Sequence, residues 1–96
     1  MTQVILRLPA EHPSVEGHFP GNPIVPGAVL LDEVLAAIEC ARGQPAAAWT
    51  VKWFKFLRLV RPGDELAVEF TAAPSGDIRF CCRVASLEVV TGLVRA

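Results

Sequence analysis

Residues 17–33 read GHFPGNPIVPGAVLLDE, a stretch in which a segment rich in proline and glycine runs directly into an apolar run. Four prolines lie between residues 10 and 26. They are too many for a helix or a paired strand, because proline lacks the backbone N–H that both structures use. The spacing of three between Pro20, Pro23 and Pro26 favours an extended path. From Gly27 onward, the alanine- and leucine-rich sequence predicts a helix of about fifteen residues that stops at Gly43.

The predicted helix is apolar around most of its circumference. Its large apolar residues are Val29, Leu30, Leu31, Val34, Leu35 and Ile38. A helix that is apolar nearly all round is a buried helix, so we expect the rest of this small chain to wrap around it.

The wrapping is predicted to be a β-sheet. Residues 3–9 read as a short first strand, and aromatic and β-branched residues are concentrated in three later runs, 49–60, 64–74 and 77–90. A short run at 92–96 is a further candidate strand. The turn sequences RPGD (61–64) and PSGD (74–77) separate the runs. We therefore predict one α+β domain over residues 1–96, with one long central helix wrapped by a curved antiparallel sheet.

The composition predicts a partner. The chain has 96 residues, is 52% apolar and has a mean hydropathy of +0.41. So small a domain buries a limited fraction of its surface, which leads us to expect a homo-oligomer.

The rest of the composition predicts a soluble, cytoplasmic protein. No apolar run reaches the roughly 18 residues that span a bilayer, and no secretory signal pattern is visible at the start of the chain. Cys40, Cys81 and Cys82 lack the spacing of a metal site and are read as reduced thiols. We expect no metal, no nucleic acid and no membrane partner.

Charge is distributed unevenly although the net charge is −1. Between residues 51 and 63 there is no acidic residue, and four cations occur there: Lys52, Lys55, Arg58 and Arg61. This basic strip has two interpretations. Lysine and arginine commonly protect a solvated strand edge, and a local cluster of cations also suits an acidic partner.

The stretch GHFPGNPIVPGAVLLDEV (17–34) closely resembles the signature of the (3R)-hydroxyacyl-acyl-carrier-protein dehydratases of the hot-dog fold, the FabA and FabZ enzymes and their relatives. The matching residues are His18, Phe19, Pro20, Gly21, Pro23, Pro26, Gly27 and the acid Asp32. Downstream, KFLRLVRPGDEL (55–66) resembles the strand–turn–strand motif of the same family. The small size and the LLDEVL sequence are most similar to the ApeI-type branch, which is associated with aryl polyene lipid biosynthesis.

The resemblance implies a function and a set of site residues. The function is dehydration of a (3R)-3-hydroxyacyl group, held on the phosphopantetheine arm of an acyl carrier protein, to a trans-2-enoyl group without a cofactor. The implied catalytic residues are His18, Asp32 and Gly27, and the implied substrate-binding residues are Phe19, Pro26 and Ala28. The basic strip becomes the candidate contact for the acidic carrier protein. The resemblance also implies a homodimer, with a higher oligomer or a heterodimer as alternatives, in which each site takes its histidine from one subunit and its acid from the other.

The chemistry of the residues agrees with this assignment. Dehydration needs a base for the C2 proton, which suits His18, and an acid for the departing hydroxide, which suits a carboxyl group in apolar surroundings such as Asp32. The N-terminus of a helix can stabilise the negative charge that forms on the thioester oxygen, and Gly27 lets the backbone come close. The rigid prolines would fix His18 over the helix start.

Other interpretations stay open at this point. His18 before Phe-Pro can be a turn residue, PGNPIVP can be a peptide ligand, and Asp32 can lie at a solvent edge with Glu33 as its rival. Adjacent helical residues point about 100° apart, so only one of these two acids can face His18. Ala36 occupies a position where the resembled family commonly has glutamine. An acyl thioesterase and a non-catalytic acyl-binding or heterodimerising subunit are the competing functions, because one fold supports many reactions.

Overall fold

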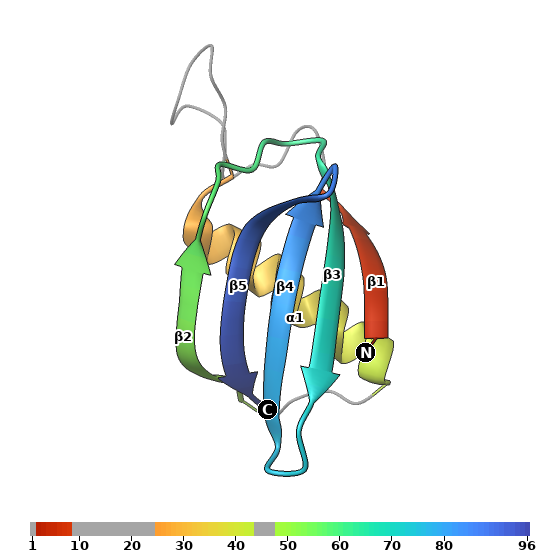
Figure 1. Cartoon of the computed structure of the whole chain (residues 1–96), viewed down its shortest axis with the longest axis vertical. Coiled ribbons are helices and arrows are strands. Elements are labelled where there is room, and N and C mark those ends of the chain that lie inside the picture. The colour runs from red at the N-terminus through yellow and green to blue at the C-terminus, as the bar shows by residue number, and fades with distance from the viewer. Residues whose placement is uncertain (1, 9–24, 44–47) are drawn as a thin grey trace.

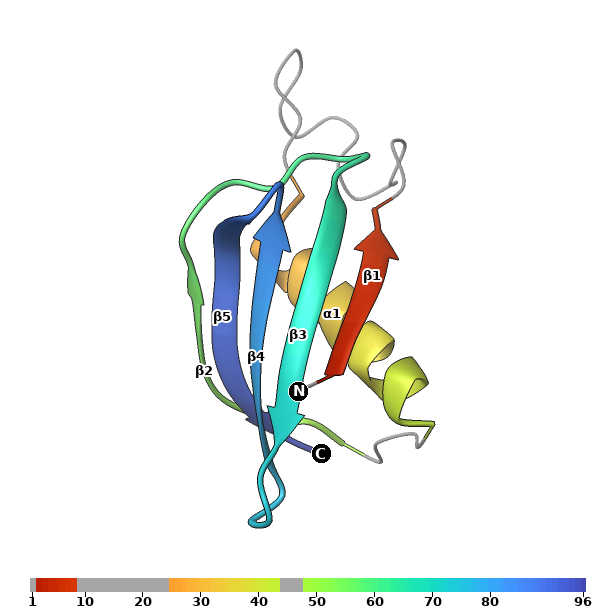
Figure 2. The same ribbon diagram turned by 45° about the vertical axis from the view of Figure 1, so that its right-hand side comes forward.

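A computed structural model of the chain describes residues 2–8, 25–43 and 48–96. Its elements, in chain order, are β1 (Thr2–Arg7), α1 (Gly27–Arg42), β2 (Thr50–Phe56), β3 (Glu65–Ala72), β4 (Asp77–Val84) and β5 (Leu87–Arg95). The five strands form one antiparallel sheet in the order β1-β3-β4-β5-β2, and α1 crosses one face of that sheet (Figures 1 and 2). The predicted α+β architecture, with a single helix against an antiparallel sheet, is confirmed.

The helix begins and ends where the sequence predicts. Pro26 has extended backbone angles (φ −58°, ψ 145°) and immediately precedes the first helical residue. At the other end, Gly43 adopts the left-handed conformation (φ 70°), and its N–H donates to the carbonyl oxygens of Glu39 and Cys40. Glycine is favoured there because it has no side chain to strain this conformation.

The helix is buried on one face, and the prediction that it is buried all round is wrong for the described chain. Its buried residues are Leu30, Val34, Leu35 and Ile38, which pack with the inner side chains of the sheet. A second set, spaced four residues apart and therefore on one side of the helix, is exposed: Ala28, Asp32, Ala36 and Cys40. The physical reason is that a five-stranded sheet covers only the side of α1 that faces it.

The strand predictions are correct except at one turn. The predicted turns at Gly63 (φ 90°) and Gly76 (φ 94°) are present, but the run 77–90 is not a single strand. It breaks at Ala85 and Ser86, both with positive φ, into the antiparallel hairpin of β4 and β5. Two-residue hairpin turns of this kind usually carry Asn or Gly, so Ala85 and Ser86 are not recognisable as a turn from their residue types.

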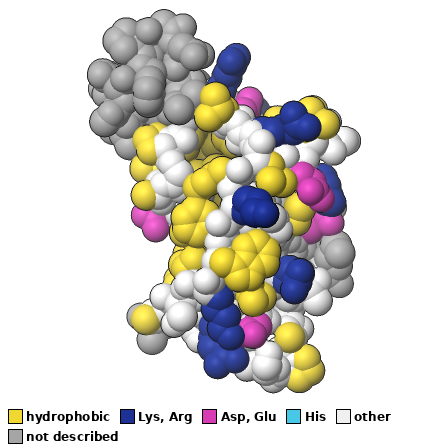
Figure 3. Space-filling model, turned by 60° about the vertical axis from the view of Figure 1, so that its left-hand side comes forward, with side chains coloured by type: hydrophobic (Ala, Val, Ile, Leu, Met, Phe, Trp, Pro, Cys, Tyr) yellow, Lys and Arg dark blue, Asp and Glu magenta, His cyan; other side chains and the backbone are white. Residues whose placement is uncertain are grey.

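The strand β2 forms an exposed edge of the sheet. It pairs with β5 alone among the described strands, and all seven of its residues are exposed. Three of them are large aromatic residues, Trp53, Phe54 and Phe56. Figure 3, which views the molecule from this side, shows hydrophobic side chains interspersed with lysine and arginine. The apolar surplus in the composition is therefore concentrated at one edge.

The three cysteines differ in their exposure to solvent. Cys82 is buried and Cys81 is half-buried on the opposite side of β4, as strand alternation requires, and all three cysteines are free thiols.

Within the described ranges, no helix is long and apolar enough to cross a bilayer.

Candidate functional site

The loop between β2 and β3, residues 57–64, ties together the two ends of the segment that carries His18. The N–H of Leu8 donates to the carbonyl of Asp64 (3.0 Å), and the N–H of Val25 donates to the carbonyl of Val60 (2.8 Å). The loop is itself fixed, because the backbone N–H of Arg61 donates to the carboxylate of Asp64 (2.8 Å). The described residues Leu8 and Val25 are therefore both held at this loop.

The start of α1 lies against this loop. The first intrahelical bond runs from the N–H of Leu30 to the carbonyl of Pro26 (2.9 Å). The N–H groups of the first turn, including that of Gly27, have no partner within the helix itself. Among the described residues no side chain caps this end, and its first turn contains no acid. The helix dipole and the free N–H groups together make this end a place where negative charge is stabilised.

An apolar cavity of about 230 Å³ opens beside the helix start. Its walls come from α1, from the end of β2 and from the loop, and they include Pro26, Gly27, Leu30, Phe56, Leu59 and Val60. Arg58 is its charged lining residue. The cavity thus offers an apolar chain a path that ends at the donors of α1.

Asp32 lies on the same helix as Gly27, about 7.5 Å farther along the axis at 1.5 Å per residue. Its side chain is exposed in the single chain, as is Ala28 one turn earlier, whereas Glu33 is half-buried. The apolar enclosure that we expected for the acid is therefore not supplied by the described part of this chain. His18 and Phe19 lie outside the described residues, so their predicted roles stay predictions.

The basic strip does not form one cluster. Lys52 forms an ion pair with Asp77 on β4 (3.0 Å), which Arg95 also contacts (2.9 Å). Arg58, in contrast, lines the cavity at the helix start. Lys52 is far from this cavity, because it lies four residues before Phe56 on β2, which is about 13 Å at roughly 3.3 Å per residue. Arg61 lies in the same loop as Arg58. Neither these two arginines nor Lys55 forms an ion pair with a described residue.

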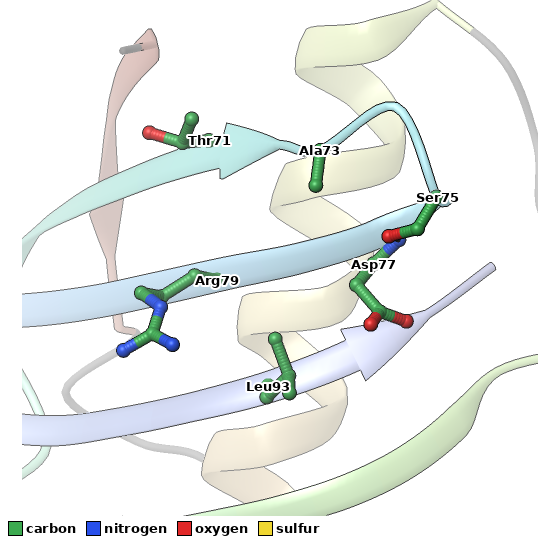
Figure 4. Close-up of a pocket in the computed structure, with 6 residues that line it drawn as sticks. All are labelled: Thr71, Ala73, Ser75, Asp77, Arg79 and Leu93. Atoms are coloured by element: carbon green, nitrogen blue, oxygen red, sulfur yellow. The ribbon is translucent and has the colours of Figure 1, made fainter.

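A second hollow, of about 280 Å³, lies on the outer face of the sheet, with α1 behind it (Figure 4). Its polar residues include Asp77 and Arg79. The pKa of the Asp77 carboxyl is lowered, chiefly because Lys52 donates a hydrogen bond to it. Burial opposes this effect, and the hydrogen bond and charge of Arg95 lower the pKa further. Of the residues predicted for catalysis or substrate binding, those that the structure describes (Pro26, Gly27, Ala28 and Asp32) do not line this hollow.

Sequence reasoning missed Phe56 as a residue of the site. Phe56 belongs to the motif KFLRLVRPGDEL, but it was predicted only to be part of a strand and not to contact the substrate. The structure places its ring against Gly27, a contact between residues far apart in the sequence. The signal available in the sequence was the pairing of a glycine at the helix start with an aromatic residue just before the PGD turn.

Comparison with known proteins agrees with this geometry. The model of the ApeI-like family, described as ApeI dehydratase, matches residues 1–92. The chain belongs to the ApeI-like family. Among curated relatives of this ApeI-like chain, the 3-hydroxyacyl-[acyl-carrier-protein] dehydratase FabZ of Latilactobacillus sakei is 40% identical over 63 residues, which are 58% of this chain and 45% of the relative. FabZ of Alkaliphilus metalliredigens is 39% identical over 82 residues, 75% of this chain and 55% of the relative. The chain thus spans about half the length of the curated relatives it matches.

Solved structures show that the ApeI-like chain has the hot-dog fold. The dehydratase heterocomplex ApeI:P of Xenorhabdus doucetiae superposes with a TM-score of 0.76 at 21% identity, covering 97% of this chain and 83% of that one. The fluoroacetyl-CoA-specific thioesterase FlK, as its F36A mutant, gives a TM-score of 0.72 at 12% identity, covering 100% and 87%. Dehydratases and thioesterases share this fold, so the fold alone does not select the reaction.

Proposed function

We propose that this chain removes water from (3R)-3-hydroxyacyl groups on an acyl carrier protein and forms trans-2-enoyl groups, in fatty acid or aryl polyene type lipid biosynthesis. The observation that carries the proposal is the glycine-led start of α1, which no described side chain caps, which opens beside an apolar cavity and which is followed on the same helix by Asp32. Membership of the ApeI-like family and the FabZ relatives support dehydration among the thioester reactions of this fold.

Each site residue is proposed to have its own role in the reaction. His18 takes the proton from C2, the electron pair left behind forms the C2–C3 double bond, and the C3–O bond breaks. Asp32 protonates the departing hydroxide, so that water leaves. The thioester oxygen gains negative charge as the proton departs, and the N–H of Gly27 stabilises it. Phe19, Pro26 and Ala28 are proposed to contact the substrate around this centre.

A second copy of the chain would complete the site. Asp32 is exposed, and the β2 edge presents aromatic residues to solvent. Enclosure by a partner would shield the carboxyl from bulk water. We therefore propose a homodimer in which His18 of one copy faces Asp32 of the other, and the alternatives are a higher oligomer and a heterodimer. Light scattering of the purified chain, alone and in the presence of neighbouring gene products, distinguishes these states.

The carrier protein is proposed to dock at the loop end of the basic strip. Arg58 and Arg61 belong to the loop that forms the cavity, whereas Lys52 is held in its ion pair with Asp77. Lys55 lies between these groups on β2. An acidic carrier protein at Arg58 and Arg61 would present its pantetheine arm to the cavity over a short path.

A panel of 3-hydroxyacyl thioesters tests the proposed reaction. We expect enoyl thioester absorbance to rise without release of free thiol. Release of thiol without enoyl product would identify a thioesterase, and tight acyl binding with neither product would identify a non-catalytic subunit. Both products are measured in the same reaction, so each function gives a different result.

A further inference from the structure

The ring of Phe56 lies directly against the first residue of α1. A Cβ atom placed on Gly27 would be 2.8 Å from both Cε2 and Cζ of this ring and 3.7 Å from its Cδ2. The first two distances are too short for real contacts, so the ring edge occupies the space that a side chain at position 27 would fill. The aromatic ring, and not open solvent, therefore borders the backbone of the helix start.

The backbone of Phe56 is held firmly, while its ring is partly free. Phe56 pairs with Val90 as the last residue of β2, and the next N–H, that of Leu57, donates to the carbonyl of Val89 (2.8 Å). Its ring meets that of Phe54 edge to face, with centroids 5.1 Å apart and planes at 82°. Phe56 lines the apolar cavity and is 41% exposed in the single chain, so its ring borders a space that a ligand can enter.

The space on that side is the apolar cavity. Its volume of about 230 Å³ is several times the ~30 Å³ that one water occupies in the liquid, which suits a short acyl segment. Phe56 and Gly27 both line it, with Leu30 and Val60 behind them. An acyl chain that lies in this cavity with its thioester oxygen at Gly27 would have the Phe56 ring beside its first few carbons.

We propose that Phe56 is a specificity-determining residue, whose ring limits the width of the acyl group beside the thioester. It favours unbranched acyl groups, which can lie flat along the ring, over groups that carry a methyl branch at C4. This inference rests on the proposed function, because it places the thioester at Gly27. A rigid wall commonly discriminates a single extra methyl group by roughly 10- to 200-fold.

The test uses binding of stable ligands, so that it does not depend on turnover. Pantetheine amides of an unbranched 3-hydroxyacyl group and of its C4-methyl counterpart are titrated calorimetrically into the wild type, Phe56→Ala and Phe56→Leu. Trp53→Ala is the matched control, because Trp53 is an aromatic residue of the same strand and is equally exposed (41%), yet it is not among the described residues that line the cavity. Light scattering and a thermal melt establish that each variant keeps the oligomeric state and fold of the wild type.

We expect the wild type to bind the unbranched ligand at least about tenfold more tightly than the branched one. This ratio should fall toward one in Phe56→Ala, fall partly in Phe56→Leu and persist in Trp53→Ala. The proposal is overturned if the wild type binds neither ligand or does not discriminate, or if Trp53→Ala changes the ratio as much as Phe56→Ala. Turnover separates this proposal from the proposed function. If binding is selective in a way that depends on Phe56 but no enoyl product forms, dehydration is refuted and the role of Phe56 stands. If enoyl product forms but binding is not selective, the role of Phe56 is refuted and dehydration stands.

Discussion

Replacement of Gly92 by alanine should destabilise the protein, because the sheet is packed around the missing side chain. A Cβ atom at position 92 would lie 2.6 Å from Cζ and 2.7 Å from Cε1 of Phe80, and 3.0 Å from the carbonyl oxygen of Trp53. Phe80 is only 1% exposed, so its ring has no open space to move into, and the carbonyl belongs to the neighbouring strand β2. Relief of both contacts requires a shift of the core or of the β2–β5 pair.

The expected loss of stability is about 2 kcal/mol. Overpacking of a core costs roughly 1–3 kcal/mol, and two close contacts at a buried ring place this site near the upper value. Alanine regains about 0.5–1 kcal/mol relative to glycine within a strand. For a domain of this size the difference lowers Tm by roughly 8–16 °C.

The loss of stability is measured by urea unfolding, followed by tryptophan fluorescence. Protein concentration is kept the same for all variants, because association contributes to stability. The double variant Gly92→Ala/Phe80→Leu is the control, since a smaller side chain at position 80 removes the closest contact. We expect the double variant to lose less unfolding free energy than the sum of the losses in the two single variants, by at least about 0.5 kcal/mol. A Gly92→Ala protein as stable as the wild type, or strictly additive effects, would refute this account of the packing.

Three further predictions concern the site and the thiols. Asp32→Ala should lower kcat/KM for dehydration by roughly 10²- to 10⁴-fold while Glu33→Ala stays within a few fold; equal losses would show that the acid is wrongly assigned. Arg58→Glu should raise KM for carrier-bound substrate but not for a short pantetheine thioester, and the rise should become smaller as salt is added. Lys52→Glu should raise this KM much less, and equal increases in the two variants would exclude docking at the loop. Burial raises the pKa of the Cys82 thiol to about 12, so in native protein at pH 8 it should resist alkylation and react only after unfolding, as mass spectrometry can determine.

Much of the fold follows from local sequence. The prolines before Gly27 and the glycine at position 43 mark both ends of α1, and the two Gly-Asp turns separate β2, β3 and β4. The turn at Ala85 and Ser86 could not be predicted, because its conformation is imposed by the pairing of β4 with β5 and not by its residue types.

The site was predictable only where the chemistry lies within one motif. Gly27 and Asp32 share a helix, so their relation follows from helical geometry. The contact of Phe56 with Gly27, and the separation of Lys52 from Arg58, depend on how β2 lies against α1, and residue spacing alone does not contain that information. The exposure of Asp32 likewise depends on how much of α1 one copy of the sheet can cover.

The central claim is that His18 and Asp32 catalyse dehydration in a site shared by two copies of the chain. His18→Ala and Asp32→Ala proteins, each inactive alone, can be unfolded together, refolded and assayed for enoyl thioester. Random pairing makes half the dimers mixed, and each mixed dimer holds one intact site of two, so activity should recover to roughly a quarter of the wild-type value. A refolded mixture with native Tm and dimeric mass that stays inactive would contradict the shared site, and full activity of either single variant would contradict the assigned chemistry.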